Sequence, residues 1–253
     1  MATETDEPTA PLPAGMASLF NSNLYSDVEV RCSDGTTYPA HKAIICTQSA
    51  VLANACNPNH AFKEARENVV ALEQDDPATV HALLVFLYDH CYTAPADGAM
   101  LFHARMYAMA EFYQVPALKE LAKRCFREEV DGEGGWADPS FALAVEVVFE
   151  STPEGDRGLR DLVVEAACRH FGELKERKEF EEVAQRIGSF SFDVAEALHR
   201  RPVLTVELKC KECSGQVKFD VGDWEKAREK LDCACGASIS LSAWMARFEQ
   251  QSE

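Results

Sequence analysis

The residues with the clearest potential for chemistry in this chain are four cysteines near its C-terminus. Cys210 and Cys213 form a C-x-x-C pair, and nineteen residues later Cys233 and Cys235 form a C-x-C pair. Thiolates in two close pairs can converge on one tetrahedral Zn²⁺ ion. Four protein ligands leave no open position for water or substrate, so the expected Zn²⁺ is structural and not catalytic.

The segments around these cysteines have the pattern of a small β module. Three stretches alternate like strands and one has a helical pattern. The strands are predicted at 205–209, 216–220 and 237–241, and the helix at 224–231. Residues 204–242 thereby resemble a zinc ribbon, with C-x-C where C-x-x-C is usual. Two alternatives stay open: four reduced cysteines without a metal, or a redox dithiol at Cys210 and Cys213, which would need a βαβ context that the sequence lacks.

No other group of residues indicates catalysis. His41 is the histidine that most resembles a catalytic one, but no nucleophile or carboxylate pair accompanies it at motif spacing, so we expect a structural, hydrogen-bonding role. The chain also lacks a phosphate-binding glycine loop, a nucleophile elbow and a metalloprotease helix. The sequence therefore predicts a protein that is not an enzyme.

The balance of charge is strongly acidic, with 42 acidic and 25 basic residues and a formal net charge of −17. Such a chain repels phosphates and anionic lipids, so neither nucleic acid nor a membrane is an expected partner. The acidic excess lies before residue 201, because residues 201–253 carry 8 basic and 9 acidic groups. This change in composition indicates a domain boundary near residue 200.

The first twenty residues contain acidic groups and prolines but no apolar core, which argues against a secretory signal. No apolar run approaches the roughly 20 residues of a membrane span. We expect an intracellular protein, in the nucleus or the cytoplasm, with reduced thiols. The cysteines outside the tail are interpreted as small buried hydrophobic residues. They are Cys32, Cys46, Cys56, Cys91, Cys125 and Cys168.

The first part of the chain has the pattern of a small sheet covered by helices. Alternation at 27–32 followed by a turn predicts a hairpin with 37–40, and the apolar run 69–72 predicts a third strand. In this part the predicted helices span 42–47, 49–55, 99–114 and 116–129, and one more begins at Asp76-Pro77. A glycine-rich linker follows at 131–135. Beyond it, three further helices are predicted at 141–150, 158–174 and 180–199. This order of elements predicts an α+β fold.

Residues 26–129 resemble the BTB/POZ family, in the compact form common in fungal proteins. Six pieces in the family's order carry the resemblance: Ser26-Asp27-Val28, Tyr38-Pro39-Ala40-His41-Lys42, residues 47–52, Phe62-Lys63-Glu64, residues 83–88, and residues 107–113 with 118–122. Residues 151–153 and 159–161 also resemble the helical region that follows such domains in fungal relatives. The fold expected is thus α+β: a BTB/POZ-like small sheet capped by helices, a helical extension and a small zinc-ribbon-like β module.

This resemblance and the change in charge divide the chain into four parts. They are a flexible leader at 1–19, a BTB/POZ-like domain at 20–130, a helical extension at 131–203 and a four-cysteine, zinc-ribbon-like module at 204–253.

The resemblance implies two sets of functional residues. In such domains the aspartate of the first strand lies near the basic residue that follows the histidine. The resemblance therefore implies a structural charge pair between Asp27 and Lys42. The alternative is that Asp27 caps the strand and Lys42 is solvated. Cullin-binding members carry a hydrophobic-x-acidic triplet, which implies that Phe62 inserts into a partner's pocket and Glu64 contacts its rim. The alternative is that Phe62 packs on its own core.

The function implied is that of an intracellular protein–protein interaction adaptor, with a cullin-type ubiquitin ligase substrate adaptor as its specific form. A transcription or chromatin-associated regulator is the alternative, because BTB domains are often joined to zinc modules. Family members often form homodimers by exchanging an N-terminal strand and helix. Here only residues 16–23 offer a short helix before the first strand, so a strand-exchanged dimer is not expected and a smaller homodimer or a monomer remains open.

Overall fold

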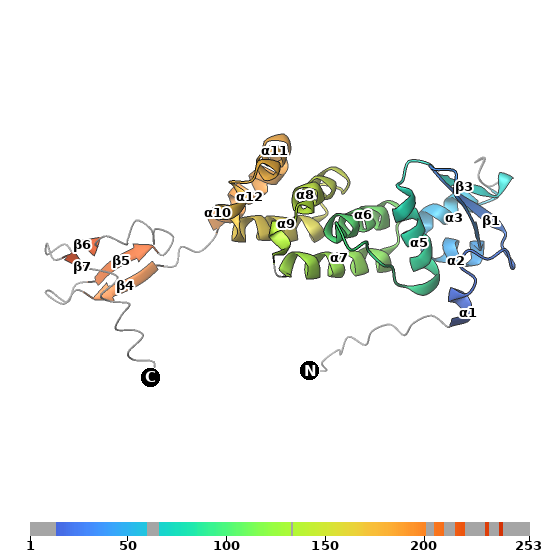
Figure 1. Cartoon of the computed structure of the whole chain (residues 1–253), viewed down its shortest axis with the longest axis horizontal. Helices are drawn as coiled ribbons and strands as arrows, with labels where there is room; N and C mark the ends of the chain where they lie inside the picture. Colours follow the sequence, from blue (N-terminus) through green and yellow to red (C-terminus); the bar gives the residue numbers. More distant parts are fainter. Residues whose placement is uncertain are drawn as a thin grey trace. The chain divides into compact units, whose positions relative to one another are not determined.

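The computed structural model of the chain describes residues 14–59, 66–132 and 134–200 and, in the tail, the backbone of four short strands (Figure 1). They belong to two compact units, Met1–Ala197 and Leu198–Glu253. The first unit contains a three-stranded sheet and the helices around it. None of the helices in these ranges has the length and apolarity that crossing a membrane requires.

The sheet of the first unit has the strand order β2-β1-β3. β1 (Val28–Cys32) lies in the centre, antiparallel to β2 (Thr37–Ala40) and parallel to β3 (Val69–Leu72). Alternate residues of β1 are buried, as the period-two pattern predicts. The turn into β2 forms because the Asp34 carboxylate accepts local hydrogen bonds and Gly35 adopts a φ of 84°. The predicted hairpin and third strand are confirmed.

Apart from the first, the helices near the sheet begin and end close to their predicted bounds. They are α1 (Ala14–Ala17), α2 (Lys42–Gln48), α3 (Ala50–Cys56), α5 (Pro77–Asp89), α6 (Ala99–Phe112) and α7 (Pro116–Asp131). The side chains of Ser49 and Asp76 cap α3 and α5 by accepting hydrogen bonds from backbone N–H groups of the first turn. Buried residues from the sheet and from α5, α6 and α7 form the core.

Five helices and a 3₁₀ turn follow residue 132 in the described part of the chain, and the first two helices pack directly on this domain. The five helices are α8 (Ser140–Glu150), α9 (Arg157–Arg169), α10 (Phe171–Leu174), α11 (Lys178–Arg186) and α12 (Gly188–Arg200), preceded by the 3₁₀ turn, η1 (Gly135–Ala137). α8 contacts α6, and α9 contacts α7 (Figure 1). Each of the last two predicted helices is in fact two. The first breaks at His170, whose ring stacks on Trp136, and the second at the buried Ile187 before Gly188. Tertiary packing overrides the local helical pattern at both places.

The described strands of the second unit form two antiparallel hairpins. In the first, β4 (Thr205–Lys209) pairs with β5 (Gln216–Asp220); in the second, β6 (Leu231–Asp232) pairs with β7 (Ser238–Ile239). The two longer strands coincide with predicted ones, and β7 lies within the strand predicted at 237–241. The helix expected at 224–231 is wrong at Leu231, which pairs with Ile239, and its other residues lie outside the described ones.

A group of polar side chains joins the helical extension to the BTB-like part. The Asp156 carboxylate accepts hydrogen bonds from the Tyr107 hydroxyl of α6 at 2.8 Å and from the Gly158 backbone N–H at 2.9 Å. Its Oδ2 lies 2.8 Å from Nζ of Lys119 in α7, which also pairs with Glu111. Burial alone would raise the pKa of Asp156, but the hydrogen bonds from Lys119, Gly158 and Tyr107 outweigh it and hold that pKa below its ordinary value of 3.8.

The corner between α8 and α9 is closed by a buried arginine. Arg160 donates hydrogen bonds to the carbonyl oxygens of Phe149 and Thr152, each at 3.0 Å, and its guanidinium lies 4.6 Å from the centre of the Phe149 ring. These carbonyls belong to the last turn of α8 and the residues after it, where the helix dipole favours a cation. The contacts thus join the two segments of the extension that carry the family resemblance, 151–153 and 159–161.

We predict that Asp156→Asn lowers the free energy of unfolding by about 2 kcal/mol at neutral pH, because it removes a largely buried anion from Lys119. A carboxyl whose folded pKa is depressed contributes stability above its unfolded pKa of about 3.8 and loses it as the pH falls through the lower folded value. The difference between wild type and variant should therefore shrink below about pH 4. Urea unfolding from about pH 3 to 7 measures it.

The matched control is Asp161→Asn, since that side chain is 63% exposed in its ion pair with Arg157. It should change the free energy of unfolding by less than about 0.5 kcal/mol. Equal effects of the two substitutions would show that Asp156 does not join the helices.

Candidate functional site

All the residues that the sequence predicts to contact a partner or a metal lie outside the described ones. They are Phe62, Glu64, Cys210, Cys213, Cys233 and Cys235. The structure gives the elements on either side of them: Phe62 and Glu64 fall between α3, which ends at Cys56, and β3, which begins at Val69. Within the described ranges, no group of His, Cys, Asp and Glu side chains could hold a metal ion.

Each cysteine pair of the tail falls in a segment that joins two paired strands. Residues 210–215 connect β4 to β5, whose ends Lys209 and Gln216 are register partners. Residues 233–237 connect β6 to β7, where Asp232 and Ser238 are partners. Pairing brings the two ends of each segment together, as a pair of neighbouring ligands for one ion requires. The strand pattern thus fits a site of four thiolates.

Asp27 and Lys42 lie together, but through a contact that differs from the expected charge pair. The Asp27 carboxylate accepts a hydrogen bond from the backbone N–H of Lys42 at 2.8 Å, in the first turn of α2. The Lys42 ammonium donates instead to Oδ1 of Asn68 at 2.6 Å. Asp27 therefore caps α2, where the side chain of His41 makes no capping hydrogen bond.

His41 is buried, and both of its ring nitrogens have hydrogen-bond partners. Nε2 lies 2.7 Å from the carbonyl oxygen of Leu24 and must donate to it, so Nδ1 accepts from the Tyr88 hydroxyl at 2.8 Å. The backbone N–H of His41 donates to the same hydroxyl at 3.0 Å. Burial raises the pKa of Tyr88 to about 12, which keeps its proton in place. His41 has the structural role that we expected.

The segment before β1 folds back on its own domain. α1 covers Ala14–Ala17, so the helix expected at 16–23 is wrong beyond its first two residues, and turns follow. The ring of Phe20 contacts three others, those of Tyr38, His81 and Tyr88, at centroid distances of 6.2, 5.4 and 5.8 Å. Together with the bond from His41 to Leu24, these contacts hold the segment on β2 and α5 of the same chain.

An exposed aromatic residue at the end of α6 was not predicted. Phe112, the last residue of α6, is 68% exposed. The carbonyl oxygen of the following Tyr113 accepts a hydrogen bond from Ser49 at 2.6 Å, so the end of α6 lies beside the start of α3. α3 leads into the segment that contains Phe62. The helical period could have identified Phe112, because it falls on the same face as the exposed Arg105.

The cysteines of the described residues differ in burial, and Cys46 and Cys125 are partly buried. Cys32, Cys56 and Cys168 are buried, as expected, whereas Cys91 is exposed. Burial raises the pKa of Cys46 to about 12, which leaves it an unreactive thiol.

The arrangement described above, a small mixed sheet with a short helix pair and longer helices, defines a class of α+β domain with no constellation for catalysis among its described residues. The family model of the BTB/POZ domain matches residues 16–129, which contain these elements. Residues 16–129 are therefore similar to a BTB/POZ domain. Such domains generally mediate protein–protein interactions and are typically not enzymes. No curated protein matches the chain significantly.

We predict that Asp27→Ala costs about 1 kcal/mol in the free energy of unfolding, because it leaves the first turn of α2 without a cap. Lys42→Met should cost less than about 0.5 kcal/mol, since only its bond to Asn68 is lost. In a double-mutant cycle measured by urea unfolding, the coupling of the two side chains should be below about 0.3 kcal/mol. A coupling above about 1 kcal/mol would instead indicate the charge pair implied by the family resemblance.

Proposed function

We propose that this chain is an intracellular adaptor, in the nucleus or the cytoplasm, whose BTB/POZ domain binds a cullin-type scaffold while the parts beyond it hold a client. The observation that carries the proposal is the position of Phe112. This exposed residue precedes Tyr113, whose carbonyl oxygen accepts a hydrogen bond from Ser49 at the start of α3, and α3 leads into the segment with Phe62 and Glu64. Aromatic anchors with polar residues around them are typical of interface hot spots.

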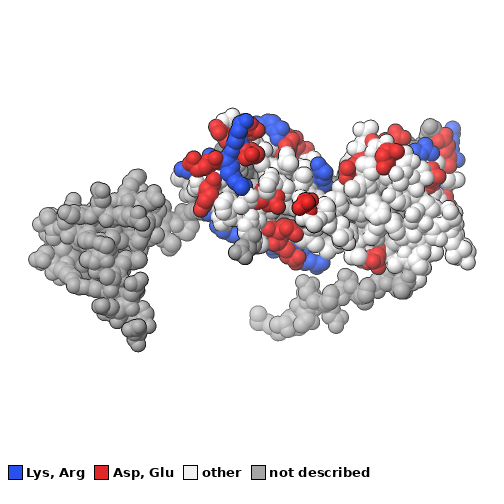
Figure 2. Space-filling model, in the orientation of Figure 1, with Lys and Arg blue, Asp and Glu red and all other residues white. Residues whose placement is uncertain are grey.

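The distribution of charge supports a protein partner. Figure 2 shows that much of the BTB/POZ part is uncharged in this view, whereas basic and acidic side chains are interleaved over the helical extension. Leu24 and Tyr25 add exposed apolar surface before β1, at 57% and 81% exposure. The centres of protein interfaces are depleted in charged residues. The alternative role, a chromatin-associated regulator that holds DNA, would have to overcome the net charge of −17.

A homodimer fits this proposal only in a form without segment exchange. BTB/POZ domains often dimerise. Here the Phe20 cluster and the hydrogen bond from His41 hold the N-terminal segment on its own domain, so exchange would first have to break both contacts. A dimer of this chain would therefore use other surfaces.

We further propose that the tail binds one structural Zn²⁺ through Cys210, Cys213, Cys233 and Cys235. The two hairpins support this, because each places one cysteine pair in the segment between paired strands. When bound, the ion would fix the two segments to each other. That is the usual means by which a β module too small for its own core becomes stable.

We predict that Phe62→Ala and Phe112→Ala each weaken binding of purified cullin N-terminal domain by about tenfold or more, since each removes an aromatic anchor. Glu64→Ala should have a smaller effect, about threefold, as expected for a residue at the rim of the interface. Biolayer interferometry on the full chain measures these affinities.

The matched control is Phe192→Ala, because Phe192 is also 68% exposed but lies in α12 of the helical extension. It should bind the cullin domain like wild type. If Phe62→Ala and Phe112→Ala do the same, the cullin-type function is wrong.

We predict that elemental analysis finds about one equivalent of zinc in the purified protein. The variants Cys210→Ser and Cys233→Ser should each contain less than about a fifth of that amount, because three thiolates bind zinc much more weakly than four. Cys91→Ser is the control, since this exposed cysteine belongs to the other unit. A zinc content below half an equivalent in the wild type would contradict the proposal.

A further inference from the structure

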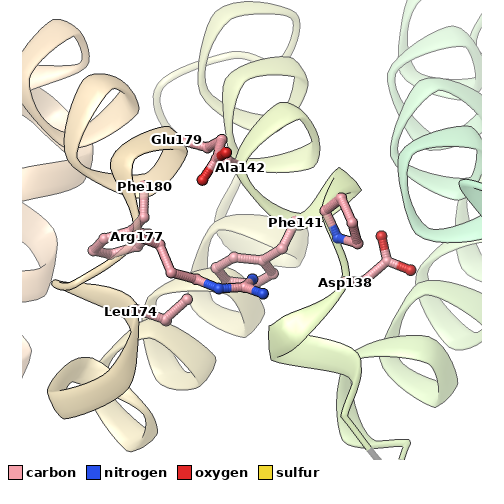
Figure 3. A pocket seen from close by; sticks show the side chains of 8 residues that line it. Asp138, Phe141, Ala142, Leu174, Arg177, Glu179 and Phe180 are labelled. Atoms are coloured by element: carbon pink, nitrogen blue, oxygen red, sulfur yellow. The ribbon is translucent and has the colours of Figure 1, made fainter.

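A small cavity lies on the helical extension, between the start of α8 and the corner that joins α10 to α11 (Figure 3). Its volume is about 110 Å³. Phe141, Phe180 and Leu174 are buried residues that give it an apolar wall. None of the residues that line it belongs to the BTB/POZ match at 16–129. The volume suits one apolar side chain and is too small for a typical organic cofactor.

The cation at this cavity is Arg177, whose side chain extends toward Phe141 in Figure 3. Within the described residues, no group pairs with its guanidinium or accepts a hydrogen bond from it. The guanidinium lies instead 6.0 Å from the centre of the Trp136 ring, and that ring stacks on His170 at 4.7 Å and 10°. Contact with an aromatic ring orients the guanidinium and leaves its N–H donors available to a ligand.

The two carboxylates at the cavity are placed away from this cation. Asp138 accepts a hydrogen bond from the backbone N–H of Ser140 at 2.6 Å, and its carboxylate points away from the other lining side chains in Figure 3. Glu179 also lines the cavity. The cavity therefore carries one cation and two carboxylates around its apolar wall.

We propose that this cavity docks a peptide segment of the client in which a glutamate or aspartate adjoins a large apolar residue. The apolar side chain enters between Phe141 and Phe180, and the neighbouring carboxylate forms a bidentate pair with Arg177. A peptide is the occupant because the space accepts a single side chain and the acidic group matches the one cation among the described residues that line it. The inference rests on the proposed function only in that the helical extension holds a client.

The test is binding of short peptides to the full chain, observed through the indole N–H resonance of Trp136, which Trp136→Phe assigns. Acetyl-Gly-Glu-Phe-Gly-amide should shift this resonance in a saturable way. The same peptide with Gln for Glu, or with Ala for Phe, should bind at least about fivefold more weakly, because each lacks one of the two contacts. Absence of any saturable shift with the Glu-Phe peptide would overturn the proposal.

Two variants locate the site. Arg177→Met should weaken the Glu-Phe peptide about tenfold, whereas Lys178→Met, which removes a charge from the next residue at 83% side-chain exposure, should not. Ala142→Leu fills the cavity without changing its charge and should also abolish binding. Equal losses in Arg177→Met and Lys178→Met, or wild-type binding by Ala142→Leu, would rule the site out. Because no cullin is present, these results are independent of the cullin-binding test.

Discussion

The carboxylate of Asp156 connects three helices that are distant in the sequence. It accepts a hydrogen bond from Tyr107 of α6, pairs with Lys119 of α7 and caps the start of α9. A carboxylate that is 11% exposed is stable only with such partners. Its position therefore requires that the corner between α8 and α9 sits on α6 and α7. As a result, the BTB/POZ-like part and the helical extension up to Ala197 belong to one compact unit.

Several cations of the first unit are paired within the chain, in different ways from Arg177. Arg160 is buried, and carbonyl oxygens at the end of α8 neutralise it in place of a carboxylate. Lys119 is shared between two carboxylates, and Arg186 pairs with Glu146. Arg177, in contrast, is oriented by a ring and has no anion among the described residues. A ligand with a carboxylate next to an apolar group would supply the anion that this cation lacks.

The N-terminal segment is also held by contacts between residues distant in the sequence. His41 can satisfy both ring nitrogens only if Leu24 and Tyr88 stay in place, and Phe20 occupies the aromatic site above them. The cost of releasing the segment is therefore shared by a buried polar group and an aromatic ring. A partner can reach the surface at Phe112 without releasing the N-terminal segment, so that surface is the more accessible one.

Local patterns in the sequence determined the hairpin at β1 and β2, the caps at Ser49 and Asp76 and the BTB/POZ order of elements, because turn and capping chemistry act between residues close in the chain. They also indicated a structural role for His41. Only the tertiary structure decided that Asp27 caps α2 while Lys42 donates to Asn68. It also decided that two predicted helices break, at His170 and Ile187. The accessibility of Phe112 and Arg177 to a partner was decided in the same way. These features depend on contacts between residues far apart in the sequence, where several partners of equal local merit compete and only the packed arrangement selects one.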